Sequence, residues 1–474
     1  MSSRQPLPFH SKFAFGFGQL GEGLWTGAIN TFVLFYYNQV LGAPATLVGL
    51  ALAAALIIDA VTDPLIGSIS DNWRSPQGRR HPFMYASTLP LGLSLILLFS
   101  PPDALGAMGL LVWLLGFSVL TRMSMTLYHV PHLALGAEMS PDAGERAVLV
   151  SFRQFFGTAG SLLAWAIGFG VFFAATAEFE NGQLNPAAYT PYAITIAIII
   201  IGSILWSAWG TRRDALRIDP GPAPAGGSRI WRTLRRTFEE ILDSLKIRAF
   251  RWLFMGVLII IVMAGVDSAL ALYVTTYFWQ IPSSQLTWFF IAIPIGIMCG
   301  ALLTRYLLRY LSKTQLLIYG TCWWAMGQVL PISLALLGWF PESGSAAQLP
   351  SLLTFRFLQG VGVAQSLIAF GAIIPDLADQ QERDTGKRSE GILFGALSFS
   401  SKAAGALGSL IAGAGLDLIG WVTAPVAEVP EVQLTRLAVL YGPGIAIFAV
   451  VSVWCFARVS LAEQPQRTLR TDAV

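Results

Sequence analysis

Long apolar segments recur along the whole chain, and short polar loops separate them. Each segment is close to, or longer than, the roughly 20 residues that an α-helix needs to cross the hydrocarbon core of a bilayer. Several exceed that minimum, which favours tilted or kinked helices. The pattern predicts an all-α membrane protein with twelve transmembrane helices, at residues 13–41, 46–71, 83–101, 105–139, 147–176, 189–209, 249–280, 283–309, 314–339, 350–378, 389–420 and 434–458.

The apolar pattern is interrupted in the middle of the chain, where a Pro/Gly/Ala-rich stretch at 220–227 precedes an amphipathic segment at 231–245. On each side of this interruption a charged loop leads into a helix that carries one cation, Arg153 in the first half and Lys402 in the second. Such duplication predicts two pseudo-symmetric six-helix bundles with a site between them, a transporter architecture. The expected division is residues 1–209, a cytoplasmic linker at 210–248, and residues 249–474.

Charge is scarce and unevenly distributed. Of the 474 residues, 54% are apolar and 12% are charged, whereas soluble domains have about 25% charged residues. Arginine crowds the loops after the second, fourth and sixth predicted spans, and the loops after the first, fifth, ninth and eleventh contain neither Lys nor Arg. Because Lys and Arg are retained on the cytoplasmic side, both termini are expected there. We expect no cleavable signal peptide, since the first apolar stretch is too long for one.

The net charge of +3 follows from these loops. It indicates contact with lipid headgroups rather than with nucleic acid. The three cysteines have no paired spacing, so neither a disulfide framework nor a cysteine metal site is predicted. The expected partners are membrane lipids and a small-molecule solute, and the protein is expected to act as a monomer.

The most informative motif is a pair of carboxylates inside the second apolar segment. Asp59 and Asp63 are four residues apart and share one helical face. Each costs about 2.5–3.5 kcal/mol at the bilayer centre, so a cation is expected to offset them. Thr62 adds a hydroxyl, and Pro64 frees a backbone carbonyl, because proline has no N–H. These oxygens favour a small hard cation or a proton.

At this point the sequence resembles the glycoside-pentoside-hexuronide:cation symporters of the major facilitator superfamily. The motif at 59–71, followed by Arg74 and by 78–83, is similar to the signature of that family, and the segment 375–379 with 388–390 is similar to its second-half counterpart. The resemblance implies a secondary active transporter in the plasma membrane, or the bacterial inner membrane, and no enzyme activity. It implies cation-coupled symport of a sugar or glycoside by alternating access. No cofactor is implied apart from the coupling ion, Na⁺ or H⁺.

The resemblance also assigns roles to individual positions. It makes Asp59 and Asp63 the ligands of Na⁺, assisted by Thr62 and by Thr126 in the fourth span, and it makes Lys402 the coupling residue. Each assignment has an alternative without a role in transport. Asp59 and Asp63 could form a purely structural ion pair with Lys402, and the hydroxyls of Thr62 and Thr126 could bond the backbone of their own helices.

The substrate side departs from the family pattern. The family's sugar-binding acids fall at Gly23 and His129, so neither carboxylate is present, and Glu22 is one residue off. Around His129 the sequence resembles the animal sodium-dependent lysophosphatidylcholine symporters, which keeps a lysolipid or another anionic solute open as cargo. The expected substrate-binding residues are Glu22, His129, Arg153, Asp267, Tyr128 and Trp25. Most aromatic residues on these helices are also explained by packing.

A further charged set lies in the loops and is interpreted as a cytoplasmic gate. It comprises Asp71, Arg74, Arg79, Arg80, Arg146, Asp376, Asp379 and Arg388.

Two other function classes remain as alternatives. An intramembrane prenyltransferase would need a second acidic cluster facing Asp59 and Asp63, and the only candidate, Asp376 with Asp379, lies at a predicted helix end. A passive facilitator would have no use for the cost of burying the two acids.

Overall fold

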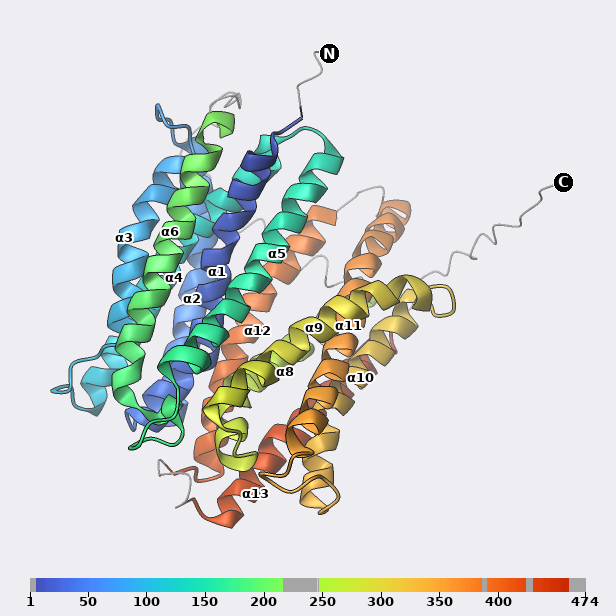
Figure 1. The fold of residues 1–474 in the computed structure, drawn as a ribbon. Helices are drawn as coiled ribbons and strands as arrows, with labels where there is room; N and C mark the ends of the chain where they lie inside the picture. The colour runs from blue at the N-terminus through green and yellow to red at the C-terminus, as the bar shows by residue number, and fades with distance from the viewer. Residues whose placement is uncertain (1–5, 216–244, 246, 386–389, 423–428, 460–474) are drawn as a thin grey trace.

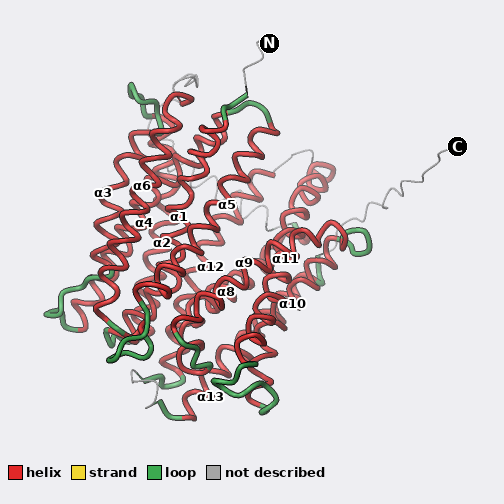
Figure 2. The backbone as a smooth tube through the Cα atoms, viewed as in Figure 1, coloured by secondary structure: helices red, strands yellow, loops and turns green. Residues whose placement is uncertain are grey.

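The computed structural model describes residues 6–215, 245, 247–385, 390–422 and 429–459 (Figure 1). Throughout this part of the chain the regular elements are helices, with no strand (Figure 2). The predicted amphipathic stretch in the linker lies outside the described residues, apart from Leu245. The main helices are α1 (Phe9–Phe35), α2 (Ala45–Asn72), α3 (His81–Leu98), α4 (Ala107–Met139), α5 (Ala143–Ile167), α6 (Tyr189–Ala215), α8 (Arg248–Tyr273), α9 (Ser283–Leu307), α10 (Lys313–Leu336), α11 (Gln348–Thr385), α12 (Glu390–Leu418), α13 (Glu431–Val439) and α14 (Ile445–Phe456).

The all-α class and the membrane character are confirmed. Within the described ranges, nine helices are long and apolar enough to cross a membrane. Some boundaries differ from the prediction. Helix α5 begins at Ala143 rather than 147, because the Asp142 side chain accepts a hydrogen bond from the Glu145 backbone N–H at 2.8 Å and caps the helix. Helix α11 continues to Thr385, seven residues beyond the predicted end at 378.

The helices of residues 6–215, here the N-terminal half, lie together, and α8–α11 of the C-terminal half lie beside them (Figure 1). In the N-terminal half α1 packs against α5 and α6, and α4 packs against α2 and α3. In the C-terminal half α11 packs against α9 and α10. Helix α12 packs along α2 of the other half as well as against α8. The α2–α12 contact therefore joins the two halves along their length.

The two ends of the molecule differ in charge. We call the end that carries the N-terminus, the arginine-containing loop at 73–80 and the loop at 140–142, which Arg146 follows in the first turn of α5, the basic end. The loops at the opposite end, among them 41–44 and 279–282, contain neither Lys nor Arg. Figure 1 shows the ribbons of the halves converging toward the opposite end and diverging toward the basic end.

Hydrogen bonds hold the halves together at the opposite end. The Tyr273 hydroxyl donates to Asn38 Oδ1 at 2.9 Å, and the Tyr277 hydroxyl donates to Gln39 Oε1 at 2.7 Å. Gln183 bonds both Thr276 and Ser283 of the C-terminal half, at 2.9 and 2.7 Å. These side chains are buried. The opposite end is therefore closed in this conformation.

Glycines permit two close helix crossings. Where α1 meets α5, a Cβ placed on Gly23 would lie 2.0 Å from the Gly157 carbonyl oxygen, and one on Gly160 would lie 2.2 Å from the Leu20 carbonyl oxygen. Where α2 meets α12, a Cβ on Gly49 would lie 2.6 Å from the carbonyl oxygen of Ser409. Only glycine allows backbones to approach this closely.

The α1–α5 crossing leads to a first prediction. Gly23→Asp, which would place an acid where the family has one, is expected to lower the melting temperature of the purified protein rather than to restore a sugar ligand, because any side chain forces the two backbones apart. Gly116→Ala is the matched control, since a Cβ there meets no atom within 4 Å. A Gly23→Asp protein that melts like the wild type would contradict this account of the crossing.

Candidate functional site

Four of the predicted residues meet between α2, α4 and α12. The Thr126 hydroxyl lies 2.7 Å from Asp59 Oδ1 and 3.0 Å from Asp63 Oδ1. Lys402 reaches across from the other half, lies 2.7 Å from Asp59 Oδ2 and also bonds Asp63 Oδ2. We call these four residues the acidic cluster. The Asp59 side chain is 9% exposed, whereas those of Asp63 and Lys402 are 26% and 31% exposed.

The chemistry of the acidic cluster is that of a cation site. Two carboxylates and a hydroxyl supply hard oxygen ligands. The Lys402 ammonium already holds one oxygen of each carboxylate, so a small cation that binds here competes with it. Because Lys402 belongs to the other half, this competition connects cation binding to the contact between the halves.

Thr62 is not brought into the acidic cluster. Its hydroxyl donates to the Asp59 backbone carbonyl at 3.0 Å, so it bonds its own helix.

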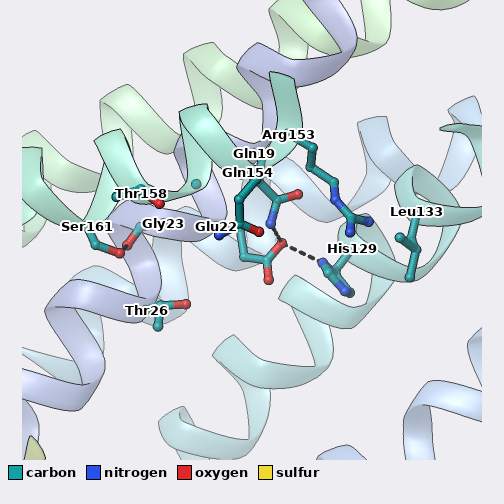
Figure 3. A pocket seen from close by; sticks show the side chains of 11 residues that line it. Gln19, Glu22, Gly23, Thr26, His129, Leu133, Arg153, Gln154, Thr158 and Ser161 are labelled. Carbon is teal, nitrogen blue, oxygen red and sulfur yellow. Dashed lines mark hydrogen bonds and ion pairs between the residues drawn. The ribbon is translucent and has the colours of Figure 1, made fainter. Parts of the chain in front are cut away.

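Next to the acidic cluster lies a cavity of about 360 Å³ between α1, α4 and α5. Glu22, His129 and Arg153 all line it, and Figure 3 shows their side chains turned toward one another. Glu22 Oε2 accepts hydrogen bonds from both Gln19 Nε2 and the His129 ring. The remaining lining residues are nearly all small or polar: Gln19, Gly23, Thr26, Leu133, Gln154, Gly157, Thr158 and Ser161.

One face of α4 connects the cavity to the acidic cluster. Thr126, His129 and Leu133 recur at intervals of three and four residues, so they share that face. Thr126 bonds the acids, whereas His129 and Leu133 line the cavity. A solute in the cavity and an ion at the acids would thus contact the same helix.

Three predicted substrate residues lie elsewhere. Tyr128 and Trp25 are buried and do not line the cavity. Trp25 donates from Nε1 to the Thr121 hydroxyl at 3.1 Å. Asp267 lies in the interior of the C-terminal half, where it pairs with Arg356 at 3.3 Å and accepts a hydrogen bond from the Tyr441 hydroxyl.

The sequence interpretation overlooked two buried arginines. Arg356 on α11 donates to Asp267, to Gln359 Oε1 at 2.9 Å and to the Tyr441 hydroxyl. Arg122 on α4 lies with its guanidinium 5.4 Å from the centre of the Trp25 ring and is 7% exposed. A signal existed for both, because an arginine inside an apolar span always needs an explanation.

Five of the residues predicted as a gate contact groups within their own halves. Arg80 bonds Asp71 and lies 2.6 Å from Glu138, which Arg79 also contacts at 2.7 Å. Arg146 donates to the backbone carbonyls of Ser140 and Pro141, at 3.1 and 2.8 Å. Asp376 pairs with Lys313 at 2.6 Å. Arg74 and Asp379 are exposed, and Arg388 lies outside the described residues.

Comparison with known proteins bears on these features. A family model described as MFS/sugar transport protein matches residues 14–463. The chain is 24% identical to the inner membrane symporter YicJ of Escherichia coli, over 98% of this chain and 93% of that protein. It is 22% identical to an isoprimeverose transporter of Lactiplantibacillus pentosus, over 88% of this chain and 81% of that protein.

Among solved structures, the inward open conformation of the xylose transporter XylE from E. coli matches with a TM-score of 0.60 and 13% identity, over 96% of this chain and 97% of that one. This likeness concerns the fold. The family match covers nearly the whole chain and agrees with the resemblance to glycoside-pentoside-hexuronide:cation symporters. The chain therefore belongs to the MFS/sugar transport protein family, whose members are multi-pass membrane transporters and not enzymes.

Proposed function

We propose that this protein couples the entry of Na⁺ or H⁺ at the acidic cluster to the uptake of a sugar or glycoside bound in the α1–α4–α5 cavity. The observation that carries the proposal is the position of Lys402, which comes from one half of the molecule and pairs with two acids of the other beside a polar cavity. A cation that displaces Lys402 changes the contact between the halves, which is what coupling requires.

The proposed topology has twelve transmembrane helices in two six-helix bundles, residues 1–209 and 249–474, with the linker at 210–248 and both termini in the cytoplasm. Loop charge supports this orientation, since the arginine-rich loop at 73–80 lies at the end that carries the N-terminus. On this assignment the closed opposite end is periplasmic, and the conformation faces inward. We propose the monomer as the functional unit.

The acidic cluster provides the oxygen ligands that a monovalent cation needs, from Asp59, Asp63 and Thr126. In the absence of the ion, the Lys402 ammonium bridges the two carboxylates and offsets part of their mutual repulsion. Both Na⁺ and H⁺ satisfy this scheme, because each cancels one negative charge. Thr62 contributes no oxygen in this conformation.

The lining of the cavity favours a polyhydroxylated cargo over a lysolipid. Among the lining residues Leu133 is the one large apolar side chain, whereas an acyl chain needs a predominantly apolar wall. Amides and hydroxyls from Gln19, Gln154 and Thr158 suit sugar hydroxyl groups. The isoprimeverose transporter among the relatives supports the same cargo class.

Uptake into proteoliposomes tests the proposal. Purified protein reconstituted into vesicles is expected to concentrate a radiolabelled pentose, hexose or disaccharide when an inward Na⁺ or H⁺ gradient is imposed, and to stop when the gradient is dissipated. Lysophosphatidylcholine serves as the competing cargo. Uptake of sugars that only equilibrates, whatever the gradient, would refute cation coupling.

A further inference from the structure

Arg122 is a buried cation for which the scheme above has no use. It precedes Thr126 by one helical turn on α4, so the two side chains leave the helix on the same side. Its exposed fraction is 7%, and the guanidinium is placed over the Trp25 ring at 5.4 Å. Trp25 is itself fixed by its hydrogen bond to Thr121, the residue before Arg122.

The charge of Arg122 has no carboxylate in direct contact. In the described part of the chain no acidic oxygen lies within ion-pair distance of it, in contrast to Arg80 and Arg356. Asp59 is the carboxylate to which this face of α4 leads, because Thr126, one turn beyond Arg122, bonds Asp59 Oδ1 at 2.7 Å. A buried cation without a direct counter-ion is costly inside a membrane protein. The presence of Arg122 beside the acidic cluster therefore indicates a function.

The location of the charges within the two halves suggests that function. Asp59, Asp63 and Arg122 all belong to the N-terminal half, and Lys402 belongs to the other. When Lys402 is engaged, the four charges sum to zero. When it is withdrawn, the N-terminal half keeps two negative charges and one positive charge, a net charge of minus one.

We propose that Arg122 is a permanent counter-charge that restricts the acidic cluster to one monovalent cation per transport cycle and weakens its hold on that cation so that it can be released. The inference rests on the proposed cation coupling. Trp25 positions the guanidinium close enough to act on Asp59 through space, and without the direct contact that would block an ion from the carboxylate.

The test is carried out in a variant without Lys402. Removing Arg122 would strengthen the attraction of the two acids for Lys402 as well as for the ion, so competition from Lys402 would hide the change in cation affinity. In a Lys402→Gln background, Arg122→Gln is expected to tighten cation binding roughly tenfold, the Coulomb effect of one charge at partly screened range. Arg122→Lys in the same background is the matched control and is expected to bind like the parent. Because no carboxylate contacts Arg122 directly, Arg122→Gln breaks no ion pair of the described fold.

Binding is followed by thermal unfolding and tryptophan fluorescence of the purified protein in detergent, in a Na⁺ titration with choline as the replacing ion and in a proton titration without Na⁺. The other charged or titratable groups that bear on the proton titration are Asp63 on α2 and Arg122 on α4, together with His129, Glu22 and Arg153, which line the neighbouring cavity. Tighter binding of at least one of the two ions supports the proposal.

Unchanged or weaker binding of both ions in Arg122→Gln, with a cation response still present in the Lys402→Gln parent, overturns the inference about Arg122 and leaves the proposed symport standing. A wild-type protein that responds to neither ion overturns both.

Discussion

Asp59→Asn is expected to abolish concentrative uptake by the reconstituted protein and to weaken cation binding by about ten- to hundredfold. The carboxylate accepts hydrogen bonds from Lys402 and Thr126 in a nearly dry environment, and an interaction with such a charged group contributes roughly 1.5–3 kcal/mol. The amide keeps the shape of the side chain but cannot neutralise a cation. The measurement compares gradient-driven uptake with cation-dependent thermal stabilisation in the same preparation.

The matched control is Asp103→Asn, which makes the same chemical change at an exposed position in the loop between α3 and α4. It should transport like the wild type. If Asp59→Asn kept both its cation dependence and its concentrative uptake, the acidic cluster would not be the coupling site.

Arg356→Met is expected to produce the largest loss of stability. The substitution leaves the Asp267 carboxylate buried, with the side chains of the pair only 7% and 12% exposed, and without its counter-ion. Breaking a buried pair on one side costs about 3–5 kcal/mol in the free energy of unfolding. Thermal unfolding in detergent should show this as a large fall in the apparent melting temperature.

Two comparisons sharpen the result. Lys313→Met breaks the pair with Asp376, whose side chains are 39% and 41% exposed, and should cost at most about 1 kcal/mol. The double variant Arg356→Met/Asp267→Leu removes both charges and should recover much of the loss. Equal melting temperatures for Arg356→Met and Lys313→Met would show that the network around Asp267 has no structural role.

Much of this architecture was predictable from the sequence, because a bilayer sets the length of each apolar segment. The meeting of Asp59 and Asp63 with Lys402 was also predictable, since paired acids at membrane depth require a cation and the chain offers few. Thr126 followed from its place in the family pattern. The cavity residues His129 and Arg153 fell at or near places of the family's sugar site, whereas Glu22 was predicted although it lies one residue from the family's acid.

Other features depended on contacts that spacing does not reveal. Asp267 and Arg356 are 89 residues apart, and their pairing requires knowledge of how α8 meets α11. The Thr62 hydroxyl could bond either the neighbouring acids or the backbone of its own helix, and it donates to the Asp59 backbone carbonyl. At Gly23 the family pattern suggested a lost ligand, whereas the structure shows a contact between two helix backbones.

The tight meeting of α2 and α12 at Gly49 also sets a mechanical scale. Asp59 and Asp63 follow Gly49 by 10 and 14 residues, which corresponds to lever arms of about 15 and 21 Å along a straight helix. A rotation of α2 relative to α12 by only about 10°, with Gly49 as the pivot, moves the two acids by about 3 Å. That is further than a hydrogen bond to Lys402 can stretch. A small rotation about Gly49 would thus suffice to separate the Lys402 ammonium from Asp59 and Asp63.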